Sequence, residues 1–231
     1  MHDLSQVPVI TLDGPSGTGK GTLCHLLAKK LGWHFLDSGA IYRVLALAAR
    51  QQEIGLTDTA TLVNLAKTLD LYFNESGVYL KGHDVSQVIR TEKCGQDASC
   101  LAALGDVREA LLWRQRVFAT SPGLVTDGRD MGTVVFPQAQ LKIFLYASVE
   151  ARAQRRYLQL KKNEENVSLA QVVNELTERD ARDMARKHAP LRPADDAVLI
   201  DTTGFAVLQV FDKVMRLIEA RGFNWGSVGS I

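Results

Sequence analysis

Short apolar runs alternate along the chain with segments whose apolar residues recur at helical spacing. Four apolar runs are bounded by turn or capping residues and predict buried parallel strands, at positions 7–13, 123–127, 141–146 and 197–201. The first run is followed by residues 20–31, where leucines recur at helical spacing and predict a helix. This alternation of strands and helices predicts an α/β fold with a parallel sheet.

Two segments differ in character from this α/β frame. In residues 69–85, two short strand-like runs flank positions 74–77, which predicts an antiparallel hairpin inserted between the two halves of the core. Residues 152–192 are highly charged and helical in pattern, and Ser168 and Gln171 have the spacing of a capping box at the start of a helix. We therefore expect two additions to the core, one a small sheet and one helical.

Residues 14–22 read Gly-Pro-Ser-Gly-Thr-Gly-Lys-Gly-Thr, directly after a predicted strand and at the start of a predicted helix. This is the context of a phosphate-binding P-loop, in which glycines let backbone N–H groups turn toward a β-phosphate and Lys20 reaches the β- and γ-phosphates. The alternative is a chance glycine-rich turn, which the spacing of the glycines and Lys20 disfavours. Gly21 stands where a P-loop usually has Ser or Thr, so the hydroxyl that meets Mg²⁺ is displaced by one residue, to Thr22.

An arginine lies at the centre of an apolar helical stripe in residues 102–119. Leu104, Val107 and Leu111 are spaced as one face of a helix, and Arg108 falls in the middle of that face. Because a buried guanidinium needs an anionic or hydrogen-bonding partner, the pattern predicts either a structural salt bridge or a bound ligand at this position.

The helix that starts at Ser168 changes from apolar to charged along a single face. Leu169, Val172 and Leu176 define that face. Its continuation carries three arginines, one of them at its edge, and one carboxylate: Arg179, Arg182, Asp183 and Arg186. Their convergence predicts a site for a polyanion with a neighbouring hydroxyl group. The alternative is a solvated helix end, which would place these charges opposite the apolar stripe.

Two polar clusters lie where predicted strands end. Residues 35–39 lead into a helix that carries Tyr42 and Arg43, and residues 125–130 close the strand that begins at position 123. In these clusters Ser38 alone would be an ordinary N-cap, and Asp127 before a glycine an ordinary turn. Because ligands bind at the carboxyl ends of parallel strands, both clusters become site candidates beside the P-loop.

Composition narrows the class of protein. The chain has 231 residues, with 27 Lys and Arg against 26 Asp and Glu, and its net charge of +1 excludes a general binder of polyanions. Residues 152–192 nevertheless hold ten basic against six acidic residues, so this segment has a local charge of 10 − 6 = +4. No apolar stretch approaches the roughly 18 residues that span a bilayer, and the first residues do not resemble a secretory signal. We expect a reduced, cytoplasmic protein whose last residues, 223–231, form a frayed tail.

These motifs together resemble the bacterial-type cytidylate kinases, a family of P-loop nucleoside monophosphate kinases. The matching segments follow one another in family order from about position 7 to about position 200, at residues 14–22, 37–43, 84–91, 107–112, 127–137 and 179–191. The resemblance implies a three-layer P-loop kinase core, a monophosphate-binding insertion with a small antiparallel sheet, and a mobile helical lid. It implies core segments at 1–37, 121–151 and 193–231, the insertion at 38–120 and the lid at 152–192.

The resemblance also assigns roles to individual residues. For ATP it implies the phosphate loop: Gly14, Pro15, Ser16, Gly17, Thr18, Gly19, Lys20, Gly21 and Thr22. For the acceptor nucleotide it implies Ser38, Ser99, Arg108, Arg129, Asp130, Arg179, Asp183 and Arg186, to which Arg43 is added as a cation suited to the acceptor phosphate. The residues expected at the transferring phosphoryl group are Lys20, Arg129, Arg155 and Arg156, and Thr22 and Asp127 are expected near Mg²⁺ through water.

The chemistry of cytosine is consistent with this assignment. Cytosine carries an N4 amino donor beside two acceptors, so a carboxylate such as Asp130 and a guanidinium such as Arg108 complement it, with the Ser99 hydroxyl beside them. Uracil would instead turn its O4 acceptor toward the carboxylate, which should cost about 1 to 3 kcal/mol.

The resemblance implies ATP-dependent phosphorylation of CMP and dCMP by direct in-line transfer, with Mg²⁺. Its partners would be these small nucleotides, without nucleic acid or membrane, and the protein is expected to be a monomer. One alternative is a P-loop kinase that acts on UMP or AMP. A GTPase switch is another, since residues 201–204 match a D-x-x-G element, but the chain lacks an N-K-x-D motif. A nucleic-acid-binding module, suggested by the basic segment alone, is the third.

Overall fold

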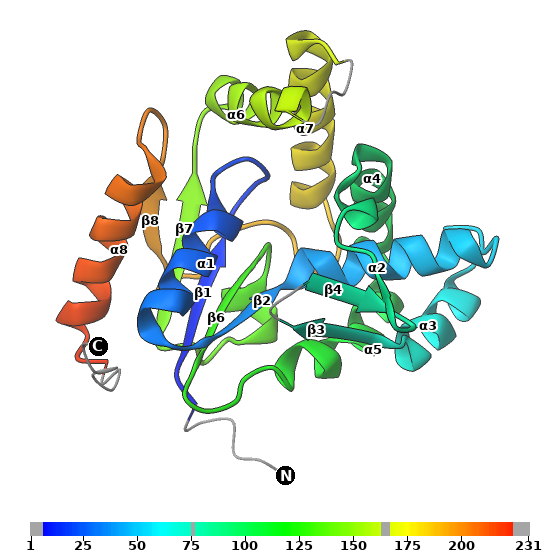
Figure 1. Ribbon diagram of the computed structural model, residues 1–231, viewed down its shortest axis with the longest axis horizontal. Coiled ribbons are helices and arrows are strands. Elements are labelled where there is room, and N and C mark those ends of the chain that lie inside the picture. The colour runs from blue at the N-terminus through cyan, green and yellow to red at the C-terminus, as the bar shows by residue number, and fades with distance from the viewer. Residues whose placement is uncertain (1–6, 75–76, 163–166, 224–231) are drawn as a thin grey trace.

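The centre of the molecule is a five-stranded sheet in which every neighbouring pair of strands is parallel (Figure 1). The computed structural model describes residues 7–74, 77–162 and 167–223. The order of the strands is β2-β6-β1-β7-β8, with bounds β1 Val9–Asp13, β2 His34–Asp37, β6 Leu124–Gly128, β7 Leu141–Tyr146 and β8 Val198–Asp201. The expected parallel α/β core is therefore confirmed, and the four predicted strands lie within about two residues of their predicted bounds.

The sheet is covered on both faces, as a three-layer fold requires. Along β1, Ile10 and Leu12 pack with α1 (Lys20–Leu31) and α8 (Val207–Ala220). Val9 points the other way, into a cluster that includes α2 (Ser38–Gln51). Strands buried on both faces are typical of parallel sheets, and β1 and β6 are buried at every position.

The register brings several acidic residues to one end of the sheet. Asp13, the last residue of β1, lies opposite Gly128 of β6. On the other side of β6, Asp37 of β2 lies opposite Asp127. The carboxyl ends of these three strands therefore form one edge, and ligands of open α/β sheets bind beyond that edge.

The insertion between β2 and β6 consists of helices and a small antiparallel sheet, which lie beside one another in Figure 1. It contains α2, α3 (Thr59–Thr68), β3 (Leu71–Asn74), β4 (Gly77–Leu80), β5 (His83–Asp84), a 3₁₀ turn at Val88–Arg90, α4 (Glu92–Leu101) and α5 (Gly105–Arg116). The predicted hairpin is confirmed, although residues 75–76 of its turn lie outside the described residues. The third strand, β5, is not predicted by the sequence because its two residues are polar and exposed.

The charged segment forms two helices that pack on each other, α6 (Val149–Lys162) and α7 (Leu169–Met184). Figure 1 places them above the end of the sheet toward which the strand arrows point. Their contact is a small cluster of buried apolar side chains: Ala153, Leu160, Val172 and Leu176. Ser168 caps α7 by accepting a hydrogen bond of 3.1 Å from the Gln171 backbone N–H, but the Gln171 side chain donates to Glu175. Only half of the predicted capping box is therefore formed.

The remaining expectations about elements need small corrections. The predicted helix over 102–119 is shorter, since α5 begins at Gly105 after the separate helix α4 has ended at Leu101. The tail expected over residues 223–231 lies, except for its first residue, outside the described part of the chain. Within the described residues, no helix combines the length and apolar character that crossing a membrane requires.

Candidate active site

The glycine loop between β1 and α1 is shaped by two close approaches. Gly14 has a φ of 142°, and a Cβ there would lie 2.0 Å from the Leu145 carbonyl oxygen, so only glycine fits. Gly17 has a φ of 80° and lies against the backbone of Arg152, where a Cβ would come within 2.9 Å of the arginine Cβ. The loop is thus held between β7 and α6, with the N-terminus of α1 at its end.

Lys20 is the first residue of α1, and its side chain is folded back over the loop. Its Nζ donates to the Pro15 carbonyl at 2.7 Å and lies 3.4 Å from Thr18 Oγ1. Burial lowers the pKa of Lys20, and the nearby Arg129 acts in the same direction. An added anion would relieve both effects, so this ammonium is suited to a phosphate group.

A first cleft lies beside the loop, between α6 and the start of α8. It is lined by apolar and polar side chains from several elements: Gly17, Thr18, Gly19, Thr22, Leu23, Arg155, Gln159, Thr202, Phe205, Val207 and Val210. A mostly apolar cleft that continues into a phosphate loop has the chemistry of a nucleoside site. Among the residues predicted for ATP, Gly17, Thr18, Gly19 and Thr22 line this cleft.

A second cleft lies on the other side of the loop, between the insertion and α7. It is lined by Asp37, Ser38, Gly39, Tyr42, Ala98, Ser99, Ala102, Arg108, Asp127, Gly128, Arg129, Asp130, Arg179, Asp183 and Arg186. Every residue predicted for the acceptor is among them except Arg43. Segments more than 140 residues apart in the sequence, from Ser38 to Arg186, are therefore brought to one cleft.

Arg108 and Asp130 form a buried ion pair in this second cleft. Arg108 also donates to the Ala102 carbonyl at 3.2 Å and lies 5.8 Å from the centre of the Tyr42 ring. Burial raises the pKa of Asp130, although the neighbouring arginines act against this. Of the two alternatives left open for Arg108, the salt bridge is therefore present, and a role in binding a ligand stays a prediction.

Asp183 is the centre of a second group of charges. It accepts from Arg129 Nε at 2.9 Å and from Ser99 Oγ at 3.2 Å, and it pairs with Arg186. Burial opposes the ionisation of Asp183, but the surrounding arginines outweigh that effect and hold the pKa of its carboxyl below the usual range. On α7, Asp183 is buried on the same side as Val172 and Leu176, and Arg179 lines the second cleft, so the alternative of a solvated helix end is wrong. Arg186 itself follows the last residue of α7.

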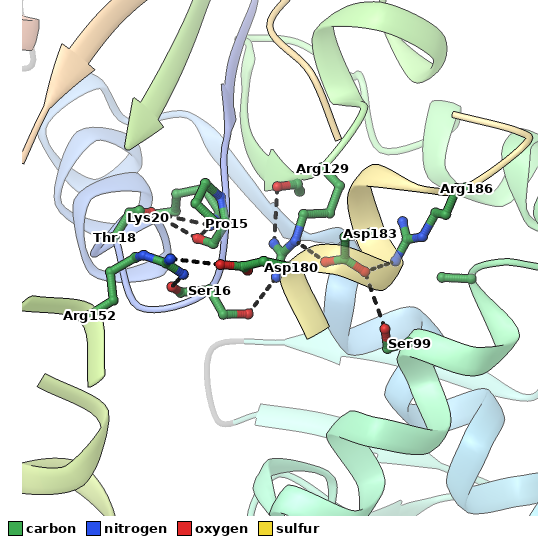
Figure 2. A network of polar contacts seen from close by, with 12 residues as sticks. Pro15, Ser16, Thr18, Lys20, Ser99, Arg129, Arg152, Asp180, Asp183 and Arg186 are labelled. Carbon is green, nitrogen blue, oxygen red and sulfur yellow. Dashed lines mark hydrogen bonds and ion pairs between the residues drawn. The ribbon is translucent and has the colours of Figure 1, made fainter. Parts of the chain in front are cut away.

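The glycine loop and α7 are joined by two contacts that both involve Ser16 (Figure 2). Arg129 donates to Ser16 Oγ at 2.7 Å, while Arg152 donates to the Ser16 carbonyl at 3.1 Å. Arg152 is also paired with Asp180 of α7 at 2.6 Å. The sequence did not indicate Asp180, although its position four residues after Leu176 on the same helical face is a signal that could have found it.

Several buried polar atoms at the second cleft have no hydrogen-bond partner among the residues that the structure describes: Tyr42 Oη, Asp127 Oδ1, Arg179 Nε and Arg186 Nε. Burial and repulsion by neighbouring arginines lower the pKa of Arg179 to about 9. Burial, followed by repulsion from Asp37, raises the pKa of Asp127. Unpartnered groups of both signs are suited to a ligand that carries phosphate and to a cation.

Four of the predicted arginines do not line the second cleft. Arg182 donates to Gln96 Oε1 at 3.2 Å. Arg43 donates to the Ile89 and Thr91 carbonyls, at 2.7 and 3.3 Å. Arg155 lines the first cleft and donates to the Gly17 carbonyl at 3.3 Å. Arg156 is paired with Glu92 of α4 at 3.1 Å.

Other lining residues were not indicated by the sequence. Gln159, Thr202 and Phe205 line the first cleft from segments that carry no phosphate-binding motif. In the second cleft, Asp37 and Tyr42 belong to a strand-end cluster that the sequence had already made a site candidate, without giving either residue a role. Lining residues of this kind depend on tertiary contacts, which no spacing rule reports.

Comparison with known families gives a match over most of the chain. A family model described as cytidylate kinase matches residues 10–220. The chain is 55% identical to the cytidylate kinase of Aeromonas hydrophila subsp. hydrophila over 216 residues, which span 92% of this chain and 94% of that relative. It is 52% identical to the cytidylate kinase of Shewanella denitrificans over 221 residues, which span 93% of this chain and 97% of the relative.

Comparison with solved structures supports the fold. An uncharacterized protein from Eubacterium ventriosum superposes with a TM-score of 0.53 at 12% sequence identity, covering 93% of this chain and 99% of that one. At such low identity the likeness concerns the fold alone.

Proposed function

The chain belongs to the cytidylate kinase family, and on that premise we propose how its two clefts divide the work of phosphoryl transfer. The protein is an enzyme that phosphorylates CMP and dCMP, with ATP as the co-substrate implied by the family. The first cleft, beside the glycine loop, takes the donor nucleotide. The second cleft takes the acceptor.

The buried pair of Arg108 and Asp130 is the observation that carries the assignment of the acceptor base. Asp130 accepts a hydrogen bond from the N4 amino group of cytosine, and Arg108 donates to the acceptor atoms of the base. Ser99 lies beside them. Uracil has an oxygen where cytosine has the amino group, so it would leave Asp130 unpaired and facing another acceptor. This arrangement favours CMP over UMP.

The ribose and phosphate of the acceptor meet the charges of α7 and β6. Asp183, with Arg179 beside it, accepts hydrogen bonds from ribose hydroxyls, and Ser38 lies at the same cleft. Arg129 and Arg186 bind the acceptor phosphate, which replaces part of their pairing with Asp183. Arg43 joins them only after its side chain leaves the Ile89 and Thr91 carbonyls.

Residues 14–22 bind the phosphates of ATP. Backbone N–H groups of the loop and the N-terminus of α1 face the anion, and Lys20 exchanges its contact with the Pro15 carbonyl for the phosphates. Arg155, at the donor cleft, and Arg156, paired with Glu92, are the lid cations that neutralise the transferring group. Both must change partners to do so.

The residues near the loop fit a magnesium ion. Asp127 Oδ1 is buried without a partner among the described residues, and Thr22 offers an exposed hydroxyl in the first turn of α1. Magnesium is bound by oxygen ligands, few of them from protein and several from water and phosphate, so Asp127 and Thr22 would hold it through water. When bound, Mg²⁺ neutralises charge on the phosphates.

Transfer needs no protein nucleophile, because the attacking oxygen of the acceptor phosphate is already anionic. Lys20 and the arginines align the two phosphates and offset the charge of the transition state. The insertion, residues 38–120, and the lid, residues 152–192, close over the core and exclude water, which would otherwise receive the phosphoryl group. We further propose a cytoplasmic monomer that binds no nucleic acid.

Substitution of Asp130 tests the assignment of the base. We expect Asp130→Ala to lower the preference for CMP over UMP, measured as the ratio of kcat/KM values, by about 10- to 100-fold. Asp212→Ala, at an exposed position of α8, is the control and should leave the ratio unchanged. An unchanged preference in a folded Asp130→Ala variant would refute base recognition by this carboxylate.

A further inference from the structure

Asp13 is a buried carboxylate that lies between the two clefts without lining either of them. It is the last residue of β1, immediately before the glycine loop, and only 5% of its surface is exposed to solvent. Its Oδ1 accepts the backbone N–H of Met131 at 2.9 Å, and its Oδ2 accepts that of Gly132 at 2.8 Å. Both oxygens are therefore used to hold one short stretch of backbone.

That stretch directly follows two residues of the acceptor site, Arg129 and Asp130. It is also packed tightly against β1, because a Cβ on Gly132 would lie 2.8 Å from Thr11 Oγ1. Met131 and Gly132 begin a π-helical turn that ends at Val135. The far end of this turn is held by Arg116, which donates to the Val135 carbonyl at 2.9 Å. Asp13 thus anchors to the sheet the stretch of backbone that directly follows Arg129 and Asp130.

We propose that Asp13 is a positioning residue for the acceptor nucleotide: its two hydrogen bonds fix the backbone at Met131 and Gly132 so that Asp130 meets the acceptor base and Arg129 its phosphate. The inference rests on the proposed function of the second cleft. A carboxylate fits this position because each N–H group meets a different oxygen of Asp13, whereas an amide has an oxygen at only one of the two places.

Holding a carboxylate at this position is costly. Burial raises the pKa of Asp13 to about 6, and the nearby charge of Asp130 adds to the effect, while the two N–H groups and Lys20 act against it. An asparagine would avoid the cost of a buried charge but would turn its NH₂ group toward one of the N–H groups. We therefore expect Asp13→Asn to fold and to release one end of the anchored stretch.

The test is steady-state kinetics of Asp13→Asn with CMP, UMP and ATP, together with thermal unfolding. We expect kcat/KM for CMP to fall by about 10- to 100-fold, which is the effect of losing one buried hydrogen bond and leaving its partner unpaired. The preference for CMP over UMP should fall in parallel, while KM for ATP stays within about twofold. Asp58→Asn is the matched control, because Asp58 also accepts a backbone N–H, from Thr61 at 3.1 Å, but lies at the start of α3.

Gly132→Ala perturbs the same contact without altering Asp13. Its methyl group would displace the backbone from Thr11 and should reproduce the loss of CMP preference. Three results would overturn the inference. The first is that Asp13→Asn keeps both its kcat/KM for CMP and its preference for CMP over UMP. The second is an equal fall in kcat/KM for CMP and UMP, and the third is loss of folding in both variants.

The same assays separate this inference from the proposed function. If Asp130→Ala abolishes the preference for CMP while Asp13→Asn keeps it, this inference alone fails. If the unsubstituted enzyme shows no preference for CMP, the proposed function fails as well.

Discussion

At the scale of single residues, the second cleft leaves buried groups of both signs without a partner among the described residues. Arg108 is matched by Asp130, and Asp183 is shared by Arg129 and Arg186. Arg179 has a buried nitrogen without a partner in the described part of the chain. Buried groups without a partner are costly, and a nucleotide phosphate at Arg179 and a cation at Asp127 would compensate them.

Lys20 offers the simplest test at this scale. We expect Lys20→Met to lower kcat by about 100- to 1,000-fold, because a preorganised charge at the transferring phosphates is removed. Binding of CMP should remain within a few-fold of the unsubstituted enzyme, since Lys20 does not line the acceptor cleft. Transfer that stays within a few-fold of normal, measured by ADP release, would contradict the assignment of the glycine loop.

The pKa of Asp13 makes a prediction about stability. In the folded protein the carboxyl of Asp13 has a pKa of about 6, whereas its ordinary pKa is 3.8. The stabilisation that comes from the protonated carboxyl is therefore lost as the pH rises from about 4 through 6. This rise in the pKa corresponds to about 3 kcal/mol of unfolding free energy. Relative to the unsubstituted protein, Asp13→Asn should therefore gain about 3 kcal/mol of unfolding free energy between pH 4 and pH 7.

Urea unfolding of both proteins at several pH values measures this difference. A difference that is constant over the range, or that changes in the opposite direction, would show that Asp13 does not titrate as its burial requires.

Some site residues could be predicted from the sequence and others could not. Arg108 and Asp183 were found because their helical phase places a charge among apolar residues. Asp13 has the appearance of an ordinary strand end, and its partners lie 118 and 119 residues away. Local patterns report which face of an element a residue occupies, but they do not report what the tertiary fold brings against it.

At the scale of elements, the strands were predicted better than the insertion. β1, β6, β7 and β8 are apolar runs that end at turn or capping residues, and such runs predict buried parallel strands well. β5 has two polar residues and depends on pairing with β4 for its conformation. The helix predicted over 102–119 begins three residues before α5, because residues 102–104 are apolar and continue its pattern.

The pair of helices α6 and α7 is attached to the glycine loop through Arg152. Asp180 is the carboxylate that balances this buried arginine, which also donates to the Ser16 carbonyl. We expect Asp180→Asn to speed amide hydrogen exchange in α7 and to raise KM for ATP by about tenfold, because a buried arginine without a counter-charge weakens the contact with the loop.

Glu178→Gln, at an exposed position of α7, is the matched control. Unchanged exchange and unchanged KM in Asp180→Asn would mean that the Arg152 contact does not hold these helices to the loop.

At the scale of the whole molecule, the parallel sheet places both clefts at one edge, on either side of the glycine loop. The net charge of +1 is an average over unlike parts, since residues 152–192 carry +4 and the rest of the chain therefore sums to −3. The helices of this segment, α6 and α7, lie above the sheet edge where, on the proposed function, the phosphates of two nucleotides would meet (Figure 1). The positive charge is therefore local to this segment, while the molecule as a whole remains nearly neutral.

The most direct test of the account is a single assay of the unsubstituted enzyme with four acceptors. Initial rates with CMP, dCMP, UMP and AMP, at one ATP concentration, give the relative kcat/KM values. The pairing of Asp130 with an amino group predicts that CMP and dCMP are both phosphorylated at least about tenfold more efficiently than UMP. Adenine also carries an amino group, so the rate with AMP tests the family assignment and not this pairing. Equal or greater efficiency with UMP would contradict the pairing, and equal or greater efficiency with AMP would contradict the assignment to CMP.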